Sequence, residues 1–127
     1  MKSSLRFLHF TQLAALFVLA VTVATFRLDA HAVLKSSSPA ASSVVAGPDV
    51  AVTLTFNVRV DAARSRLELL MPDASTIPLP IGKQPAPDTL ASRMSGLKSD
   101  AYTIRWQVLA PDGHISRGEI PFTVKNL

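Results

Sequence analysis

The hydrophobic pattern of this chain is clearest between Asp49 and Val60, where apolar and polar residues alternate strictly. An alternation of period two over this length predicts a β-strand with one buried face. A second strong strand is predicted over 101–109, because four large apolar residues share one of its faces: Tyr102, Ile104, Trp106 and Val108. The two segments indicate a protein built mainly from β-strands.

Five weaker segments are also predicted as strands, namely 32–35, 67–71, 77–81, 89–94 and 120–124, of which the second, third and fifth alternate with a period of two. The third of them contains Pro78 and Pro80, which donate no backbone hydrogen bond, so we expect it at the edge of a sheet. The stretch 36–48 is rich in serine, alanine and proline and is predicted as a loop. Seven short strands at roughly ten-residue spacing, without helical periodicity after residue 30, predict a two-sheet antiparallel sandwich.

The aromatic residues of the strand over 101–109 also fit such a sandwich. Leu97 and Tyr102 stand five apart at the start of this strand, as in the tyrosine corner of immunoglobulin-like domains. Packing in the core is the simpler explanation for Tyr102 and Trp106, and we expect it for both side chains.

The first 30 residues differ from the rest and are predicted to be a secretory signal peptide. Lys2 and Arg6 supply a positive start, and the chain from 13 to 24 is almost wholly apolar. This apolar run is too short for a membrane-spanning helix of about 20 residues. An uncleaved N-terminal anchor is the alternative. The signal peptide leaves 31–127 as one mature domain.

The position of the cleavage site decides which chemistry the mature chain carries. Cleavage after Ala30 makes His31 the first residue and gives it a free amine. Cleavage after Ala32 matches the small-x-small pattern of signal peptidase sites slightly better, and it removes the histidine. The local pattern alone leaves both sites open.

Charge and cysteine content exclude several classes of function. The full chain has a net charge of +4, which falls to about +2 when the predicted signal peptide is removed with Lys2, Arg6, Arg27 and Asp29. No basic run with interleaved aromatic residues indicates a nucleic-acid surface. The chain has no cysteine, so thiolate metal ligands and thiol catalysis are excluded.

The histidines supply the candidate chemistry. The chain has three, His9, His31 and His114, of which the first belongs to the predicted signal peptide. If consecutive strands alternate in direction, the first strand begins at the end of the sandwich where the sixth strand ends. His31 opens the first strand, and Asp112 and His114 follow the sixth, so the three residues are predicted to meet. Asp112 and His114 are one residue apart, which in an extended segment places both side chains on the same side.

These residues offer ligands for a divalent metal. An N-terminal histidine gives two nitrogen ligands, its amine and its Nδ1, and His114 and Asp112 add an imidazole and a carboxylate. A tetragonal set of nitrogen and oxygen donors suits Cu(II), whereas Zn(II) prefers a tetrahedron. An Asp-x-His sequence alone is weak evidence, because exposed loops of this composition are usually only solvated. The pairing with His31 strengthens the copper hypothesis.

The mature region resembles the CopC-like periplasmic copper-binding domains found in bacterial copper resistance. The resemblance rests on the opening at His31, the Ser-x-Pro-Ala turn that ends at Ala40, and the order and spacing of five features near the C-terminus: Tyr102, Trp106, Asp112-Gly113-His114, Gly118 and Phe122-Thr123-Val124. It implies a seven-stranded antiparallel immunoglobulin-like Greek-key sandwich. It also implies one Cu(II) ion per chain, with His31, Asp112 and His114 as ligands, and cleavage after Ala30.

This resemblance sets the expected function. We expect a periplasmic, monomeric protein that binds copper without turnover, for sequestration, resistance or delivery to an inner-membrane copper transport protein. We expect no nucleic-acid partner and no membrane span in the mature chain. Met71 and Met94 are predicted to fill the core, so a separate Cu(I) site of the methionine-rich kind is not expected. The alternatives are an exported interaction domain without metal and a histidine-brace copper oxidase.

Overall fold

The computed structural model of the protein describes residues 31–127. The predicted signal peptide, residues 1–30, lies outside the described residues and stays a prediction. Within the described part of the chain, no helix is long and apolar enough to cross a membrane.

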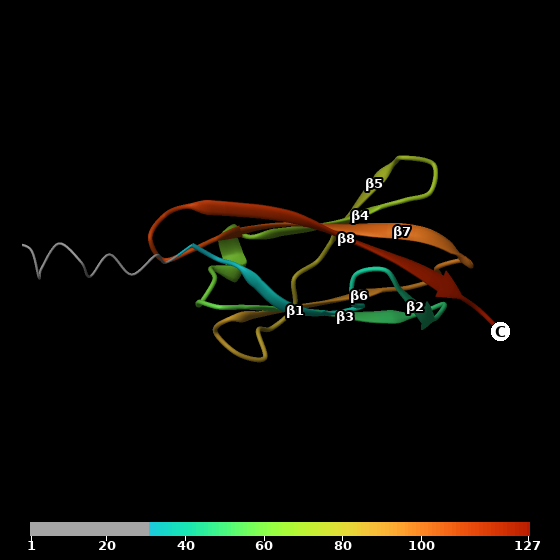
Figure 1. Ribbon diagram of the computed structural model, residues 1–127, viewed down its shortest axis with the longest axis horizontal. Helices are drawn as coiled ribbons and strands as arrows, with labels where there is room; N and C mark the ends of the chain where they lie inside the picture. The colour runs from blue at the N-terminus through green and yellow to red at the C-terminus, as the bar shows by residue number, and fades with distance from the viewer. Residues whose placement is uncertain (1–30) are drawn as a thin grey trace, which may run out of the picture.

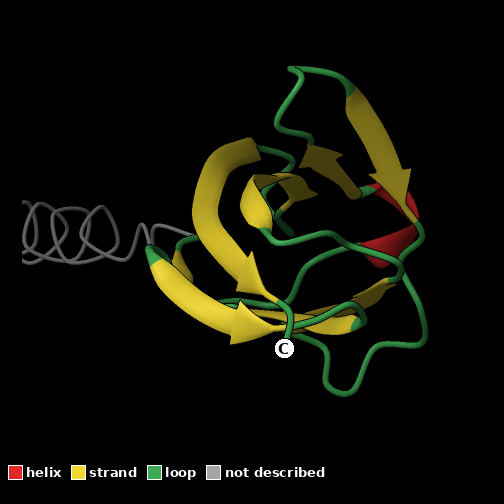
Figure 2. Ribbon diagram, turned by 90° about the vertical axis from the view of Figure 1, so that its right-hand side faces the viewer, coloured by secondary structure: helices red, strands yellow, loops and turns green. Residues whose placement is uncertain are grey.

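Two β-sheets lie face to face as the two layers of the molecule (Figure 1). The smaller sheet has the order β1-β3-β6, with strands β1 (Leu34–Ser38), β3 (Val50–Phe56) and β6 (Thr89–Met94). The larger sheet has the order β2-β8-β7-β4-β5, with strands β2 (Ser43–Ala46), β8 (Ile115–Lys125), β7 (Asp100–Leu109), β4 (Arg66–Leu70) and β5 (Thr76–Leu79). A single turn of 3₁₀-helix, η1 (Ala62–Arg64), precedes β4. Figure 2 shows how the strands curve around the interior.

The fold class predicted from the sequence, an immunoglobulin-like sandwich, is confirmed, and two details differ. The described residues form eight strands, because the predicted loop over 36–48 contains β2 and the end of β1. Strand β2 pairs in parallel with β8, so the sandwich is not purely antiparallel. The alternation of apolar and polar residues is weak in β2, because β2 is a four-residue edge strand in which Val44 remains 59% exposed. The last strand starts at Ile115 instead of 120, since Ser116 to Glu119 are partly or fully exposed.

The core lies between the two sheets and follows the predicted alternation. In β3, Val50, Val52, Leu54 and Phe56 are buried, while the residues between them face outward. Full burial of a side chain of this size stabilises a protein by roughly 1.5–3 kcal/mol. Pro78 stands in β5, at the edge of its sheet as predicted.

The predicted tyrosine corner and core positions also hold. The hydroxyl of Tyr102 donates a 2.9 Å hydrogen bond to the carbonyl of Lys98, four residues upstream. Met94 is buried, and Met71 packs against the core from a half-buried position. Both methionines therefore fill space in or beside the core, as predicted from the sequence.

Trp106 occupies a tightly packed place in the core next to Gly118. The two residues are partners in the β7–β8 ladder, and the indole ring packs edge-on against Phe56 at a centroid distance of 5.2 Å. A Cβ atom on Gly118 would lie only 2.4 Å from Cζ2 of the indole. The Trp106 Nε1 is buried and has no hydrogen-bond partner within residues 31–127. Only glycine leaves room for the ring at this point.

We predict that Gly118→Ala destabilises the protein by about 1–3 kcal/mol, because the added methyl group overpacks the core against Trp106. The measurement is urea unfolding followed by Trp fluorescence. Gly82→Ala is the matched control, since a Cβ there would meet only the Ala91 carbonyl at an ordinary 3.7 Å. Equal stabilities for the two variants would contradict this account of the packing.

Candidate metal centre

The loop between β7 and β8 is a tight turn that its sequence explains. The N–H of Gly113 donates to the carbonyl of Ala110, and the N–H of Ala110 donates to the carbonyl of His114, both at 3.0 Å. Pro111 favours the second position of such a turn, and Gly113 supplies the left-handed conformation that closes it, with a φ of 84°. The turn holds Asp112 and His114 at one end of the sandwich.

Asp112 is the centre of the group of side chains at this end. Its Oδ1 accepts a 2.9 Å hydrogen bond from the N–H of His114, and its Oδ2 lies 2.9 Å from Nδ1 of the same histidine. Nδ1 of His31 lies 3.6 Å from the same Oδ2. The two imidazole rings meet nearly edge-on, with their centroids 4.4 Å apart. The carboxylate therefore faces both imidazoles at once.

The contacts of Asp112 also affect its ionisation. The hydrogen bond from the His114 N–H, ahead of the other contacts with His114 and His31, holds the pKa of the Asp112 carboxyl below its usual range, although partial burial opposes this. The carboxylate is therefore ionised at neutral pH and available as a ligand.

His31 reaches Asp112 because β1 and β8 begin at the same end of the molecule (Figure 1). The parallel pairing of β2 with β8 shows that β2 continues in the direction of β1 and crosses to the other sheet. The extra strand therefore does not change the direction in which the following strands run. The start of β1 and the end of β7, the sixth strand predicted from the sequence, still lie at the same end. Asp112 and His114 lie in a turn and not in an extended segment. The prediction that an extended backbone places their side chains on the same side is therefore wrong.

Asn57 fixes the segment that carries His31. Its side-chain Oδ1 accepts a 2.7 Å hydrogen bond from the N–H of Val33, and its own N–H donates to the carbonyl of Val33 at 3.0 Å. Ala32, between Val33 and His31, is buried in the core. Asn57 was not among the candidates from the sequence, because a polar residue on the outward face of an alternating strand looks like any solvated residue.

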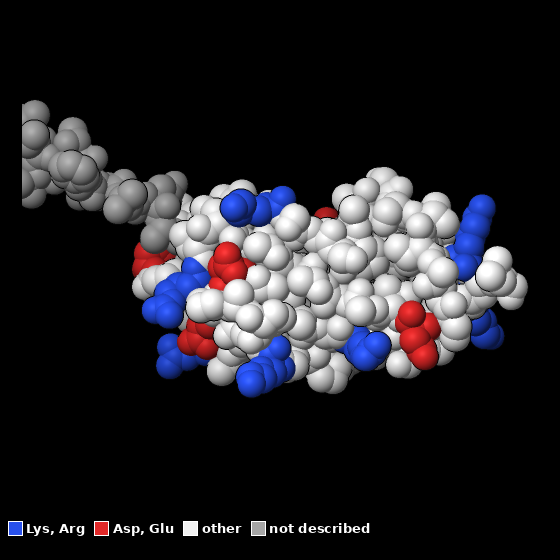
Figure 3. Space-filling model, turned by 90° about the horizontal axis from the view of Figure 1, so that it is seen from below, with Lys and Arg blue, Asp and Glu red and all other residues white. Residues whose placement is uncertain are grey.

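Charged side chains gather at this end of the molecule, where the described chain begins (Figure 3). A hollow of about 300 Å³ beside the turn is lined by residues that include Arg59, Asp61, Arg64 and Pro111. The N–H of Asp61 donates to the carbonyl of Leu109, which ties this segment to the end of β7. The three candidate side chains are themselves accessible, at 47% exposure for His31, 24% for Asp112 and 64% for His114.

The donor set fits a transition-metal ion. One ligand atom from each of His31, Asp112 and His114 can be chosen so that all lie within 4.8 Å of one another. Two imidazoles and a carboxylate are suitable ligands for Cu(II) or Zn(II). The predicted site residues are thus brought together, while His9 lies outside the described residues.

Comparison with known proteins places the chain in a family. A model of the CopC domain family matches residues 34–125, so the chain belongs to the CopC domain family. It is 31% identical to "Protein YobA" of Escherichia coli over 87% of this chain and 92% of that protein. It is 31% identical to "Copper resistance protein C" of Escherichia coli over 79% and 86%, respectively. The crystal structure of CopC from Methylosinus trichosporium OB3b is similar with a TM-score of 0.69 and 30% identity, over 76% of this chain and 95% of that one.

We predict that Asn57→Ala loosens the His31 segment, because the N–H of Val33 loses its acceptor. A single hydrogen bond contributes about 1 kcal/mol, so amide exchange at Val33 should become about fivefold faster. Hydrogen exchange followed by NMR measures this. Asn126→Ala is the control, since Asn126 binds the carbonyl of Leu97, away from the His31 segment. Unchanged exchange at Val33 would contradict the positioning role of Asn57.

Proposed function

We propose that the protein is a periplasmic Cu(II)-binding protein that holds one ion per chain through His31, Asp112 and His114. The observation that carries this proposal is the convergence of the three side chains, with ligand atoms within 4.8 Å of one another. Membership of the CopC family and the named copper resistance relative support copper as the cargo.

Cu(II) is favoured over other divalent ions by the kind of donors. Nitrogen and oxygen ligands in a tetragonal set suit Cu(II), which also has the highest affinity in the divalent series. In the 127-residue chain the backbone nitrogen of His31 is an amide. Cleavage after Ala30 would convert it to an amine and supply a third nitrogen beside the imidazoles. Under this proposal, residues 1–30 are a signal peptide and 31–127 are the mature copper-binding domain.

The proposed activity is reversible binding without turnover. The candidate ligands are exposed to solvent, which allows exchange of the ion with a partner. Met71 and Met94 pack in or against the core, so within residues 31–127 no methionine cluster offers soft ligands for Cu(I). The protein would sequester copper in the periplasm or deliver it to a membrane transport protein.

Protonation should control release of the ion. Amines and imidazoles bind metals only after they lose a proton, so affinity should begin to fall as the pH drops below about 8, where an α-amine protonates, and fall further below about 6.5, where an imidazole does. The pKa of the Asp112 carboxyl lies below its usual range. Its carboxylate would therefore remain ionised over this interval, and the loss of affinity would come from the nitrogen ligands.

We predict that His114→Ala and Asp112→Asn each weaken Cu(II) binding, by more than about 100-fold for the histidine, since loss of an outer-shell contact alone costs 10–100-fold. Isothermal titration of the exported protein with Cu(II) at neutral pH measures the effect. The same titration at about pH 5.5 should show weaker binding for the unmodified protein.

Asp73→Asn is the matched control for the carboxylate. Asp73 accepts a hydrogen bond from the N–H of Ser75 as Asp112 does from His114, and the residue between has a positive φ in both turns. The Asp73 turn lacks a histidine, so this variant should bind copper normally. Tight, one-to-one copper binding that survives His114→Ala in a folded protein would contradict the proposal.

A further inference from the structure

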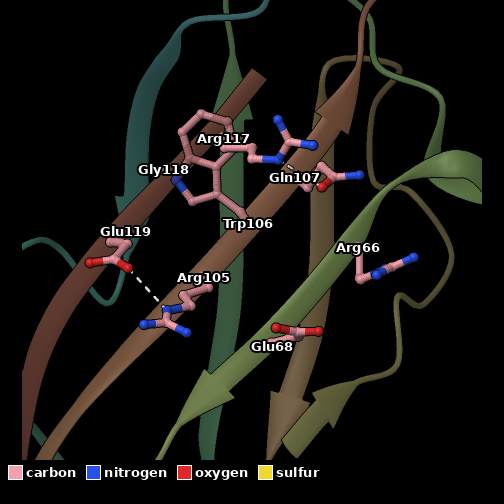
Figure 4. Close-up of a pocket in the computed structure, with 8 residues that line it drawn as sticks. All are labelled: Arg66, Glu68, Arg105, Trp106, Gln107, Arg117, Gly118 and Glu119. Carbon is pink, nitrogen blue, oxygen red and sulfur yellow. Dashed lines mark hydrogen bonds and ion pairs between the residues drawn. The ribbon is translucent and has the colours of Figure 1, made fainter. Parts of the chain in front are cut away.

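The outer face of the five-stranded sheet carries two rows of charged and polar residues across β4, β7 and β8 (Figure 4). The basic row consists of Arg66, Gln107 and Arg117, which are neighbours in the strand register. The second row lies two residues further along β4 and β8 and consists of Glu68, Arg105 and Glu119. It is called the acidic row after its two glutamates. Both rows alternate with inward-facing residues such as Leu67 and Trp106, so they point away from the core.

Interactions within one copy of the chain leave part of these rows without partners. Arg105 pairs with Glu119 at 3.0 Å, and Nε of Arg117 donates to the side-chain oxygen of Gln107 at 2.9 Å. Within residues 31–127, Arg66 and Glu68 form no ion pair. The six side chains surround a hollow of about 310 Å³. The face therefore has charges of both signs and space between them.

We propose that this face pairs with the same face of a second copy of the chain. The two copies are related by a two-fold axis that lies in the plane of the interface, between the two rows and parallel to them. This rotation sets the two faces against each other and reverses the order of the rows. The basic row of each copy then meets the acidic row of the other. Arg66 faces Glu68 of the second copy and Arg117 faces Glu119 of the second copy, and the symmetry repeats both pairs. Gln107 faces Arg105 of the second copy, so no like charges meet.

The neighbouring rows obey the same symmetry. Beyond the basic row, towards the candidate metal centre, stand Leu109 and Ile115, and Ile115 is 50% exposed. Beyond the acidic row stand Leu70, Thr103 and Pro121. The rotation that matches the charges also brings these two mostly apolar rows against each other. The outer face of the three-stranded sheet lacks such rows, since β3 presents Ala51, Thr53 and Thr55 there, and its middle is largely uncharged (Figure 3).

The surface is small, which is typical of a weak and transient interface. Three strands about 4.8 Å apart and four rows about 6.8 Å apart cover about 400 Å² per copy, half of a standard interface. The chain would therefore be monomeric when dilute and would pair when concentrated, whereas the expectation from the sequence is a monomer. The axis places the two candidate metal centres at opposite ends of the dimer, so this proposal does not depend on copper binding.

The test is sedimentation velocity between about 10 µM and 1 mM protein, at about 20 mM and 500 mM salt, because salt screens surface charge pairs. The unmodified protein should self-associate at low salt and less so at high salt. The basic-row variant Arg66→Glu/Arg117→Glu and the acidic-row variant Glu68→Arg/Glu119→Arg should each self-associate at least about tenfold more weakly, since four ion pairs become like-charge contacts. An equimolar mixture of the two should associate again, because every facing pair is then of opposite sign.

Lys35→Glu/Arg93→Glu is the control, as it makes the same charge change on strands of the other sheet. Alone, it should self-associate like the unmodified protein, because its five-stranded face is unchanged. Mixed with the acidic-row variant, it should form no mixed dimers, since Arg66 and Arg117 would then face arginines. All variants should still bind Cu(II) if the metal centre is as proposed, which keeps the two proposals separate. The dimer proposal is overturned if the unmodified protein stays monomeric at about 1 mM and low salt, or if the acidic-row variant pairs with the control as well as it pairs with the basic-row variant.

Discussion

The carboxylate of Asp112 is the point on which the candidate metal centre depends. It accepts a hydrogen bond from the N–H of His114, and this bond fixes the turn. The carboxylate also faces the Nδ1 atoms of both His114 and His31. The long β7–β8 ladder holds the turn, and the hydrogen bond from the N–H of Val33 to Oδ1 of Asn57 holds the segment that carries His31. Two segments far apart in the sequence therefore converge because the sandwich places the start of β1 and the end of β7 at the same end.

The strands with a strict alternation, such as β3 and β7, could be predicted from the sequence because one of their faces is fully buried. Strand β2 could not, since it is short, lies at an edge and leaves Val44 exposed. The meeting of His31 with Asp112 was predicted from the alternation of strand directions. It survives the missed strand because β2 continues the direction of β1. Asn57 could not be predicted, because only the contact with Val33 distinguishes it from a solvated residue.

The proposed copper site is conditional on processing. The two imidazoles and the carboxylate are already together in the 127-residue chain, whereas the amine of His31 exists only after cleavage behind Ala30. Folding would thus bring the side chains together, and export would complete the ligand set. The proposed pairing of the charge rows on the five-stranded sheet is separate from this site, and it depends on the concentration of the protein.

We propose that the amine of His31 is a ligand of Cu(II). Electron paramagnetic resonance of two copper-loaded forms tests it most directly: one that begins at His31, verified by its mass, and one that retains Ala30 before it. We predict coupling to three nitrogens in the first form, and fewer nitrogens with weaker binding in the second. Identical spectra and equal affinities for the two forms would contradict it.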